Sequence, residues 1–169
     1  MLRSYLGQVG KGEDKMKWQG TLLNIHTAPE GGAPMVSHDQ AELTAGEGIA
    51  GDRYQIGNGK YSPFPDIREV TLIEIETLIA LKRDHDIELS VDEHRRNLTT
   101  ENVPLNHLVG RQFRVGEVVL EGGRLNIPCR YLELLTGKTV FNPLENRSGL
   151  NCRIIKSGTI HLGDEITAL

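Results

Sequence analysis

Several features that commonly identify a function are scarce in this chain of 169 residues. It has only two cysteines, Cys129 and Cys152, and they lack the Cys-x-x-Cys spacing of zinc sites. Aromatic residues make up 5% of the chain, too few for platforms that stack nucleic-acid bases. No run of about 18 apolar residues occurs, so no membrane-spanning helix is predicted.

The net charge and the N-terminal sequence also narrow the possible partners and location of the protein. With a net charge of -4, the sequence gives no reason to expect nucleic acid or an anionic membrane as a partner. The N-terminus lacks the apolar stretch of a signal peptide, and the cysteine usage favours a reducing cytoplasm. Residues 1–16 are polar and contain glycine, so we expect a disordered leader there. Residues 17–169 are long enough to form one domain with its own core.

The motifs of several enzyme classes are missing as well. The six histidines show neither HxxxH nor HxH spacing, which argues against a histidine-based zinc site. No Gly-x-Gly-x-x-Gly opens a helix and no Gly-x-Ser-x-Gly occurs, so a dinucleotide site and a serine nucleophile elbow are disfavoured. Only His94 neighbours a candidate site, and we interpret it as a surface or strand-end residue.

What the chain does contain is a succession of short strand-like segments separated by glycine. Strands are predicted at 18–27, 68–73, 94–99, 112–115, 117–121, 151–156, 159–162 and 165–168. Helical spacing covers 74–84, one helical turn is expected at 104–109, and 28–66 is predicted to be a long loop region. Such a pattern favours a barrel or sandwich over a parallel α/β sheet. The predicted fold class is therefore mainly β with a few short helices, in a β-barrel-like domain.

The most informative segment is Ile127–Tyr131 (IPCRY), which opens an amphipathic run that ends at Gly137. Cys129 follows a proline at the expected first turn of a helix, where free N–H groups and partial positive charge favour a thiolate. A thiolate attacks electrophiles and binds soft metals. The alternative is a small buried residue, because free cysteine is among the most buried residue types. For Cys152, inside a predicted strand, we favour that buried interpretation.

Arginines concentrate in and beside the short polar motifs of an otherwise acidic chain. Arginine binds phosphate in a bidentate manner that lysine cannot match, so these side chains suit an anionic ligand. The alternative for each is a solvated side chain or an ion pair with an acid such as Glu69 or Glu133. The segment 147–149 (RSG) either offers a guanidinium, a hydroxyl and an N–H to an anion or is an ordinary loop before a strand. The arginines concerned are Arg53, Arg68, Arg95, Arg96, Arg130 and Arg147.

An ordered series of short motifs extends over residues 18–168. It comprises GIAGDRY at 48–54, REVTLI at 68–73, RRNL at 95–98, LVGRQF at 108–113, PC at 128–129, RSG at 147–149 and GTIHLGDEI at 158–166. In this order the series resembles the MOSC domain, the module at the C-terminus of molybdenum cofactor sulfurases. The resemblance implies a MOSC-type β-barrel-like fold and the binding of a molybdopterin-type cofactor, or of sulfur in transit.

The resemblance also implies roles for individual residues. Cys129 matches the cysteine that carries a persulfide or ligates molybdenum in the family. Arg95 and Asn97 match an arginine and an asparagine that contact the cofactor in amidoxime-reducing relatives. Arg96 stands where some relatives have proline, so either arginine is a candidate for the site. The further cofactor-binding candidates are Arg53, Arg68, Arg147 and Ser148.

Two classes of function remain open. In the first, the chain is a molybdenum-cofactor protein that reduces N-hydroxylated compounds or transfers sulfur, with Cys129 as metal ligand or sulfur carrier. In the second, it is a non-catalytic module that binds the cofactor or delivers cofactor or sulfur to partner enzymes. The sequence shows neither a pyridoxal-phosphate desulfurase domain nor a redox domain. We therefore expect pyridoxal phosphate, if used, on a separate cysteine desulfurase, and electrons from a separate donor.

Overall fold

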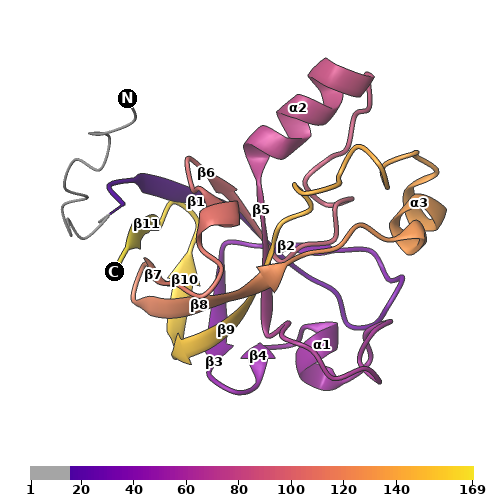
Figure 1. Cartoon of the computed structure of the whole chain (residues 1–169). Helices are drawn as coiled ribbons and strands as arrows, with labels where there is room; N and C mark the ends of the chain where they lie inside the picture. Colours follow the sequence, from indigo (N-terminus) through magenta and orange to yellow (C-terminus); the bar gives the residue numbers. More distant parts are fainter. Residues whose placement is uncertain (1–15) are drawn as a thin grey trace, which may run out of the picture.

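The computed structural model describes residues 16–169, which form a β-barrel with short helices on the side away from the C-terminus (Figure 1). None of the helices in this described part is long and apolar enough to cross a lipid bilayer. The helical elements are α1 (Arg53–Ile56), α2 (Ile75–His85), α3 (Arg130–Thr136) and the 3-10 turn η1 (Leu105–His107). The strands are β1 (Gln19–Thr27), β2 (Val36–His38), β3 (Gln40–Thr44), β4 (Gly48–Ile49), β5 (Val70–Glu74), β6 (Leu98–Glu101), β7 (Gln112–Val115), β8 (Val118–Leu125), β9 (Leu150–Lys156), β10 (Gly158–His161) and β11 (Glu165–Ala168).

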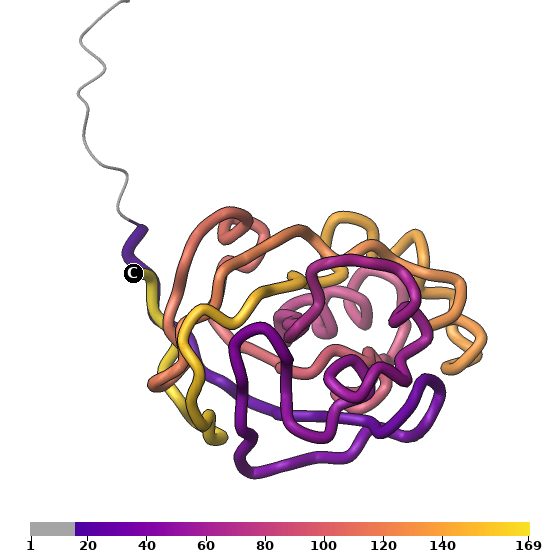
Figure 2. Tube along the Cα trace, turned by 90° about the horizontal axis from the view of Figure 1, so that it is seen from below, coloured from indigo at the N-terminus to yellow at the C-terminus, as the bar shows by residue number. Residues whose placement is uncertain are grey.

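Seven of these strands close into the barrel, in the order β11-β7-β8-β9-β5-β6-β1, because β11 also pairs with β1. Barrel neighbours run antiparallel except for the parallel pair β5 and β6. β2 extends the sheet beyond β1, and β10, β3 and β4 form a second, smaller sheet. The β1–β11 pairing brings the C-terminus beside the first described residues (Figure 2). The predicted mainly β, barrel-like fold is confirmed.

Alternating side chains of the strands fill the interior of the barrel, as period-two strands require. On β7 and β8, Phe113, Val115 and Leu120 are fully buried in this core. Cys152 on β9 is buried in the same core, as predicted. Burying a large apolar side chain such as phenylalanine or leucine contributes about 1.5–3 kcal/mol. The barrel is therefore a stable frame for the loops at its end.

A second apolar cluster holds the helices and their loops against the outside of β5. Its buried members include Ile73 of β5, Leu81 of α2, Leu132 of α3 and Leu144. Cys129 packs against the edge of this cluster. The start of α3, and with it the cysteine, is thereby fixed relative to the barrel.

Two predicted segments differ from the observed ones. The region 28–66, predicted to be a loop, contains β2, β3, β4 and α1. The strand β3 pairs with β10, which lies far along the chain. Pairing between such distant segments need not produce a local alternation of apolar and polar residues, so the sequence does not predict it. The strand predicted at 94–99 begins only at Leu98, because Arg95 adopts a left-handed backbone with φ of 63°. Apart from Met16, the predicted leader lies outside the described residues.

Candidate functional site

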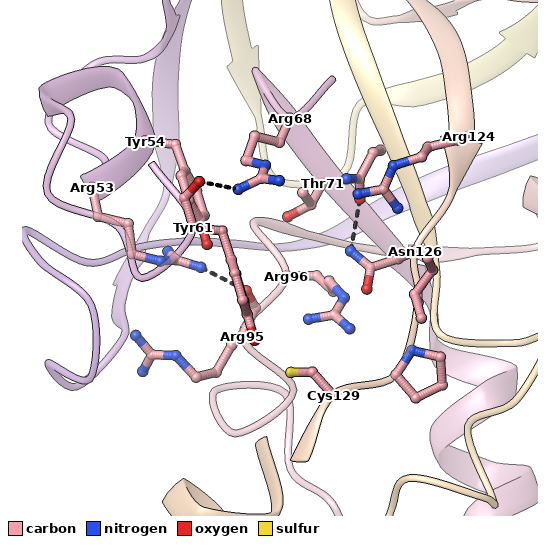
Figure 3. Close-up of a pocket in the computed structure, with 13 residues that line it drawn as sticks. Arg53, Tyr54, Tyr61, Arg68, Thr71, Arg95, Arg96, Arg124, Asn126 and Cys129 are labelled. Carbon is pink, nitrogen blue, oxygen red and sulfur yellow. Dashed lines mark hydrogen bonds between the residues drawn. The ribbon is translucent and has the colours of Figure 1, made fainter. Parts of the chain in front are cut away.

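A cavity of about 260 Å³ opens between α1, the loop that follows it, the end of β8 and the start of α3 (Figure 3). Five of its lining residues are arginines and none is an aspartate or glutamate. A recess of about 50 Å³ continues past Cys129 and adds Lys60. The protein as a whole is acidic, so this is a local concentration of positive charge. The lining residues of the cavity are Arg53, Tyr54, Tyr61, Arg68, Thr71, Arg95, Arg96, Arg124, Asn126, Ile127, Pro128, Cys129 and Asn151.

Arg96 is buried, with 8% of its surface exposed. Its Nε donates to the carbonyl of Ser148 over 3.0 Å, and its Nη2 donates to the Ser148 hydroxyl over 2.8 Å. Its Nη1 donates to the carbonyl of His94 over 3.1 Å. Burial lowers the pKa of Arg96 to about 10, so the side chain remains charged at neutral pH. Within residues 16–169 no carboxylate pairs with it, which leaves a buried cation that attracts an anion.

Arg95 lines the same cavity from the neighbouring position. Its Nη1 donates to the carbonyl of Ala33 over 2.6 Å, while its Nη2 is buried without a hydrogen-bond partner in the described chain. Burial, and then the charge of Arg53, lowers the pKa of Arg95. Both arginines of the 95–96 pair therefore reach the cavity, which answers the question that the sequence left open.

The other three arginines of the cavity are each paired with an aspartate. Arg53 pairs with Asp52 over 3.1 Å. Arg68 pairs with Asp66 over 2.8 Å, and Arg124 pairs with the same carboxylate. Hydrogen bonds from Arg124, and then from Arg68, hold the pKa of Asp66 well below its usual range. The predicted residues Arg53 and Arg68 thus line the cavity with partly neutralised charges.

Two predicted contact residues lie behind the cavity wall and act through their neighbours. The Asn97 amide donates to Asp52 over 3.1 Å and accepts from the backbone N–H of Thr71 over 3.1 Å. Asn97 is fully buried and does not line the cavity. Ser148 is also buried, and it holds the guanidinium of Arg96. In the described structure these two residues position the wall.

The structure does not bring Arg147 to the cavity, contrary to expectation. Its Nη1 pairs with Asp84, at the end of α2, over 3.3 Å. Arg130 also points elsewhere, because it pairs with Glu133 over 2.8 Å and stacks on the Phe141 ring at 4.5 Å. Both arginines form an ion pair with a nearby acid, which is the alternative that the sequence analysis gave for them.

Cys129 lies where the larger cavity and its recess meet. It is the N-cap residue of α3, it is half-buried, and its side chain makes no capping hydrogen bond. The sulfur is therefore available to a ligand. Beside it stands the phenol of Tyr61, whose pKa is raised by burial and by a hydrogen bond to Cys129. Tyr61 is consequently protonated at neutral pH, and Figure 3 shows Cys129 between it and Arg96.

Sequence reasoning missed several residues that line the cavity. Arg124 and Asn126 stand two positions apart, at and just after the end of β8, so strand alternation points both to one face. That spacing was a usable signal. Tyr54 and Tyr61 come from α1 and the loop after it. A Cβ on Gly59 would lie 2.4 Å from the Tyr54 ring, so the loop packs on that ring only because residue 59 is glycine.

His94 is buried, with 1% of its surface exposed, so the prediction of a surface or strand-end residue is wrong. Its Nδ1 accepts the backbone N–H of Arg96 over 2.9 Å, and its Nε2 lies 2.8 Å from the hydroxyl of Thr99. This arrangement selects the neutral tautomer that is protonated on Nε2. Burial lowers the pKa of His94 well below its ordinary value. The imidazole thus supports the backbone of the arginine pair.

We expect this histidine to make the protein less stable in mild acid. Because the pKa of His94 is lower in the folded than in the unfolded chain, the folded state binds fewer protons. The associated stability is complete above the unfolded pKa of about 6.5 and decreases as the pH falls below it. The measurement is the urea midpoint at several pH values for the wild type and for His94→Asn, whose amide oxygen accepts a hydrogen bond without titrating. Identical pH dependence in both proteins would contradict this role.

The two cysteines are expected to differ strongly in reactivity. Cys152 is fully buried, and burial raises the pKa of its thiol, so iodoacetamide cannot reach a reactive thiolate. Cys129 is half-buried on a cavity wall. We expect alkylation of Cys129 to be at least about ten-fold faster, measured by mass spectrometry of the folded protein. Equal rates, or faster labelling of Cys152, would show that the cavity is closed to small molecules.

Within residues 16–169, no group of three or more His, Cys, Asp or Glu side chains is arranged to hold a metal ion.

Comparisons with known proteins identify the family of the chain. The family model of the MOSC domain matches residues 60–167, whereas no curated protein matches. Among solved structures, the YuaD protein from Bacillus subtilis superposes with a TM-score of 0.74 at 16% identity, covering 89% of this chain and 97% of that one. YiiM from Geobacillus stearothermophilus gives a TM-score of 0.69 at 11% identity, covering 89% and 75%. YiiM from Escherichia coli gives 0.63 at 17% identity, covering 91% and 70%. These structures share the fold, and because the family model spans more than half of the sequence, the chain belongs to the MOSC domain family.

Proposed function

We propose that this MOSC protein binds a molybdopterin-type cofactor in the arginine-lined cavity, with Cys129 as the thiolate ligand of molybdenum or as the carrier of a persulfide. The observation that supports the proposal most is the position of Arg96. It is a buried cation with no carboxylate partner among the described residues, and it shares a cavity with the half-buried sulfur. An anionic, sulfur-linked ligand satisfies both groups.

The residues present fit such a group. A molybdopterin is anionic at its phosphate and its dithiolene, and Arg95 and Arg96 offer two positive charges that no described carboxylate neutralises. The Nη2 of Arg95 is a buried donor without a partner, which is costly unless a ligand or a small rearrangement satisfies it. The volume of about 260 Å³, extended by the recess, is close to the lower end of ligand cavities, at about 300 Å³.

When bound, the cofactor would supply two-electron redox chemistry at its metal. The chain would contribute binding and orientation. Arg95 and Arg96 would hold the anionic part of the ligand, and Cys129 would supply one sulfur. The protonated Tyr61 would donate a hydrogen bond to that sulfur, which stabilises negative charge on it. The candidate reactions are reduction of N-hydroxylated compounds and sulfur transfer.

A second candidate is delivery of cofactor or sulfur to partner enzymes. It is favoured by the partial exposure of Cys129 and by its neighbour Ile127, which is 70% exposed on the cavity wall. A partner protein could approach the sulfur from that side. Turnover of a small substrate by the isolated protein, with an artificial electron donor, would separate the first candidate from this one.

Bound pterin is the direct test of the proposal. The protein would be purified from a host that makes molybdenum cofactor and from a matched host that does not. The pterin released by oxidation would then be measured by its fluorescence. We expect about one pterin per chain from the competent host, as for one site, and none from the deficient host. Wild-type protein from the competent host that is folded and free of pterin would contradict the proposal.

A further inference from the structure

The outer end of the cavity is organised by one carboxylate, that of Asp66. This residue lies in the loop between α1 and β5 and bonds to two arginines that come from different elements. Arg68 donates to it from Nη2 over 2.8 Å. Arg124, on β8, donates to it from Nε over 2.9 Å and also from Nη2. Asp66 thus connects the loop to β8 through Arg124.

The geometry of Arg124 shows what this contact prevents. The Nε and Nη2 atoms form the edge of a guanidinium that binds an oxyanion in a bidentate manner, and Asp66 fills that edge. The remaining Nη1 donates to the carbonyl of Leu125 over 2.9 Å. All three nitrogens of Arg124 are therefore occupied by protein acceptors. An anion in the cavity can bind Nε and Nη2 of Arg124 together only if Asp66 moves away.

The charge balance favours such an exchange. Asp66 carries one negative charge and pairs with two guanidiniums, so Arg68 and Arg124 together keep a net positive charge. Asp66 is held in a loop in which Phe64, two residues before it, is 64% exposed. A phosphate group carries more negative charge and more acceptor oxygens than a carboxylate. It is therefore the stronger partner for the same two arginines.

We propose that Arg68 and Arg124 form a second anion-binding position, for a phosphate-like group, and that Asp66 occupies it in the free protein as a built-in competitor. This inference rests on the proposed anion-binding role of the cavity and adds a second point of attachment to it. The ligand class is then a molecule with two separated anionic groups. One group binds at Arg95 and Arg96, and the other displaces Asp66 from Arg68 and Arg124.

The test is the affinity for inorganic phosphate, measured by titration calorimetry at low salt, where charge effects are least screened. Removal of the competing charge in Asp66→Asn should tighten phosphate binding by at least about ten-fold. The matched control is Asp84→Asn, since Asp84 also bridges two arginines, Arg83 and Arg147, away from the cavity. That control should bind phosphate as the wild type does. In the double variant Asp66→Asn with Arg124→Gln, the gain should disappear.

The outcomes separate this inference from the proposed function. If the wild type binds phosphate and Asp66→Asn binds it equally or more weakly, Asp66 only orients the arginines, and the inference is overturned while the cavity remains an anion site. Absence of phosphate binding in every variant contradicts both. If Asp66→Asn fails to fold, hydrogen exchange of the wild type decides instead. Phosphate should then accelerate amide exchange in the loop at 58–67, and unchanged or slower exchange there overturns the inference.

Discussion

Replacement of Cys129 by serine is expected to abolish retention of molybdenum and of persulfide sulfur by protein from a cofactor-competent host. A hydroxyl is a much poorer ligand for a soft metal and a poorer nucleophile than a thiolate, although it is nearly the same size. The fold should be little affected, because Cys129 is half-buried and its side chain makes no capping bond to α3. We expect the free energy of unfolding to change by less than about 1 kcal/mol. Metal content by plasma mass spectrometry and urea denaturation measure the two effects.

The other cysteine provides the matched control. Cys152 is fully buried in the barrel core, so Cys152→Ser places a hydroxyl among apolar side chains. It should cost about 1–3 kcal/mol of stability and leave the molybdenum content per folded chain unchanged. A reversed pattern, in which Cys129→Ser melts early but keeps the metal, would assign Cys129 a structural role. The delivery or binding function would then have to operate without it.

Replacement of Arg96 by methionine is the second change with a large expected effect. Arg96 is a buried cation that shares the cavity with Cys129, so it contributes a charge-assisted contact to any anion bound there. Such a contact is worth about 1.5–3 kcal/mol, which corresponds to a loss of phosphate affinity of about 10- to 150-fold. The variant also leaves the carbonyls of His94 and Ser148 without their donor, so we expect a loss of about 1–3 kcal/mol of stability, and phosphate affinity is compared on folded protein.

Two further variants sharpen this test. Arg96→Lys keeps the charge but cannot reproduce the planar set of bonds to Ser148 and His94, so an intermediate affinity is expected. Arg111→Met removes an arginine that is exposed and does not line the cavity, and it should bind phosphate normally. If Arg96→Met and Arg111→Met lose affinity equally, the effect is one of net charge. The cavity would then have no special role in anion binding.

Much of the fold could be predicted because its strongest signals are local. Alternation gave β7 and β8 on either side of Gly116, and helical spacing gave α2 within one residue at each end. Pairing between distant strands has no such signal, which is why β3 could not be predicted although it pairs with β10 from Gln40 to Leu43. The start of β6 was misplaced for a different reason. The left-handed backbone at Arg95 is set by tertiary contacts, and non-glycine residues adopt it rarely.

The lining of the cavity could be predicted only in part, because sequence motifs identify neighbours of a cavity without showing which ones face it. Cys129 and the arginine pair line the cavity, but Asn97 and Ser148 lie behind it as supports. Arg147 belongs to a similar motif, yet it is drawn to Asp84 on another element. Which acid an arginine finds depends on the three-dimensional arrangement of loops. A linear pattern of charges does not contain that information.

We propose that the cofactor binds in the cavity beside Cys129. Anomalous diffraction at the molybdenum edge, from crystals of protein purified from a cofactor-competent host, tests it most directly. We expect one molybdenum peak next to the Cys129 sulfur, inside the cavity lined by Arg95 and Arg96. A molybdenum peak elsewhere on the molecule, or cofactor-free crystals of protein from that host, would contradict it.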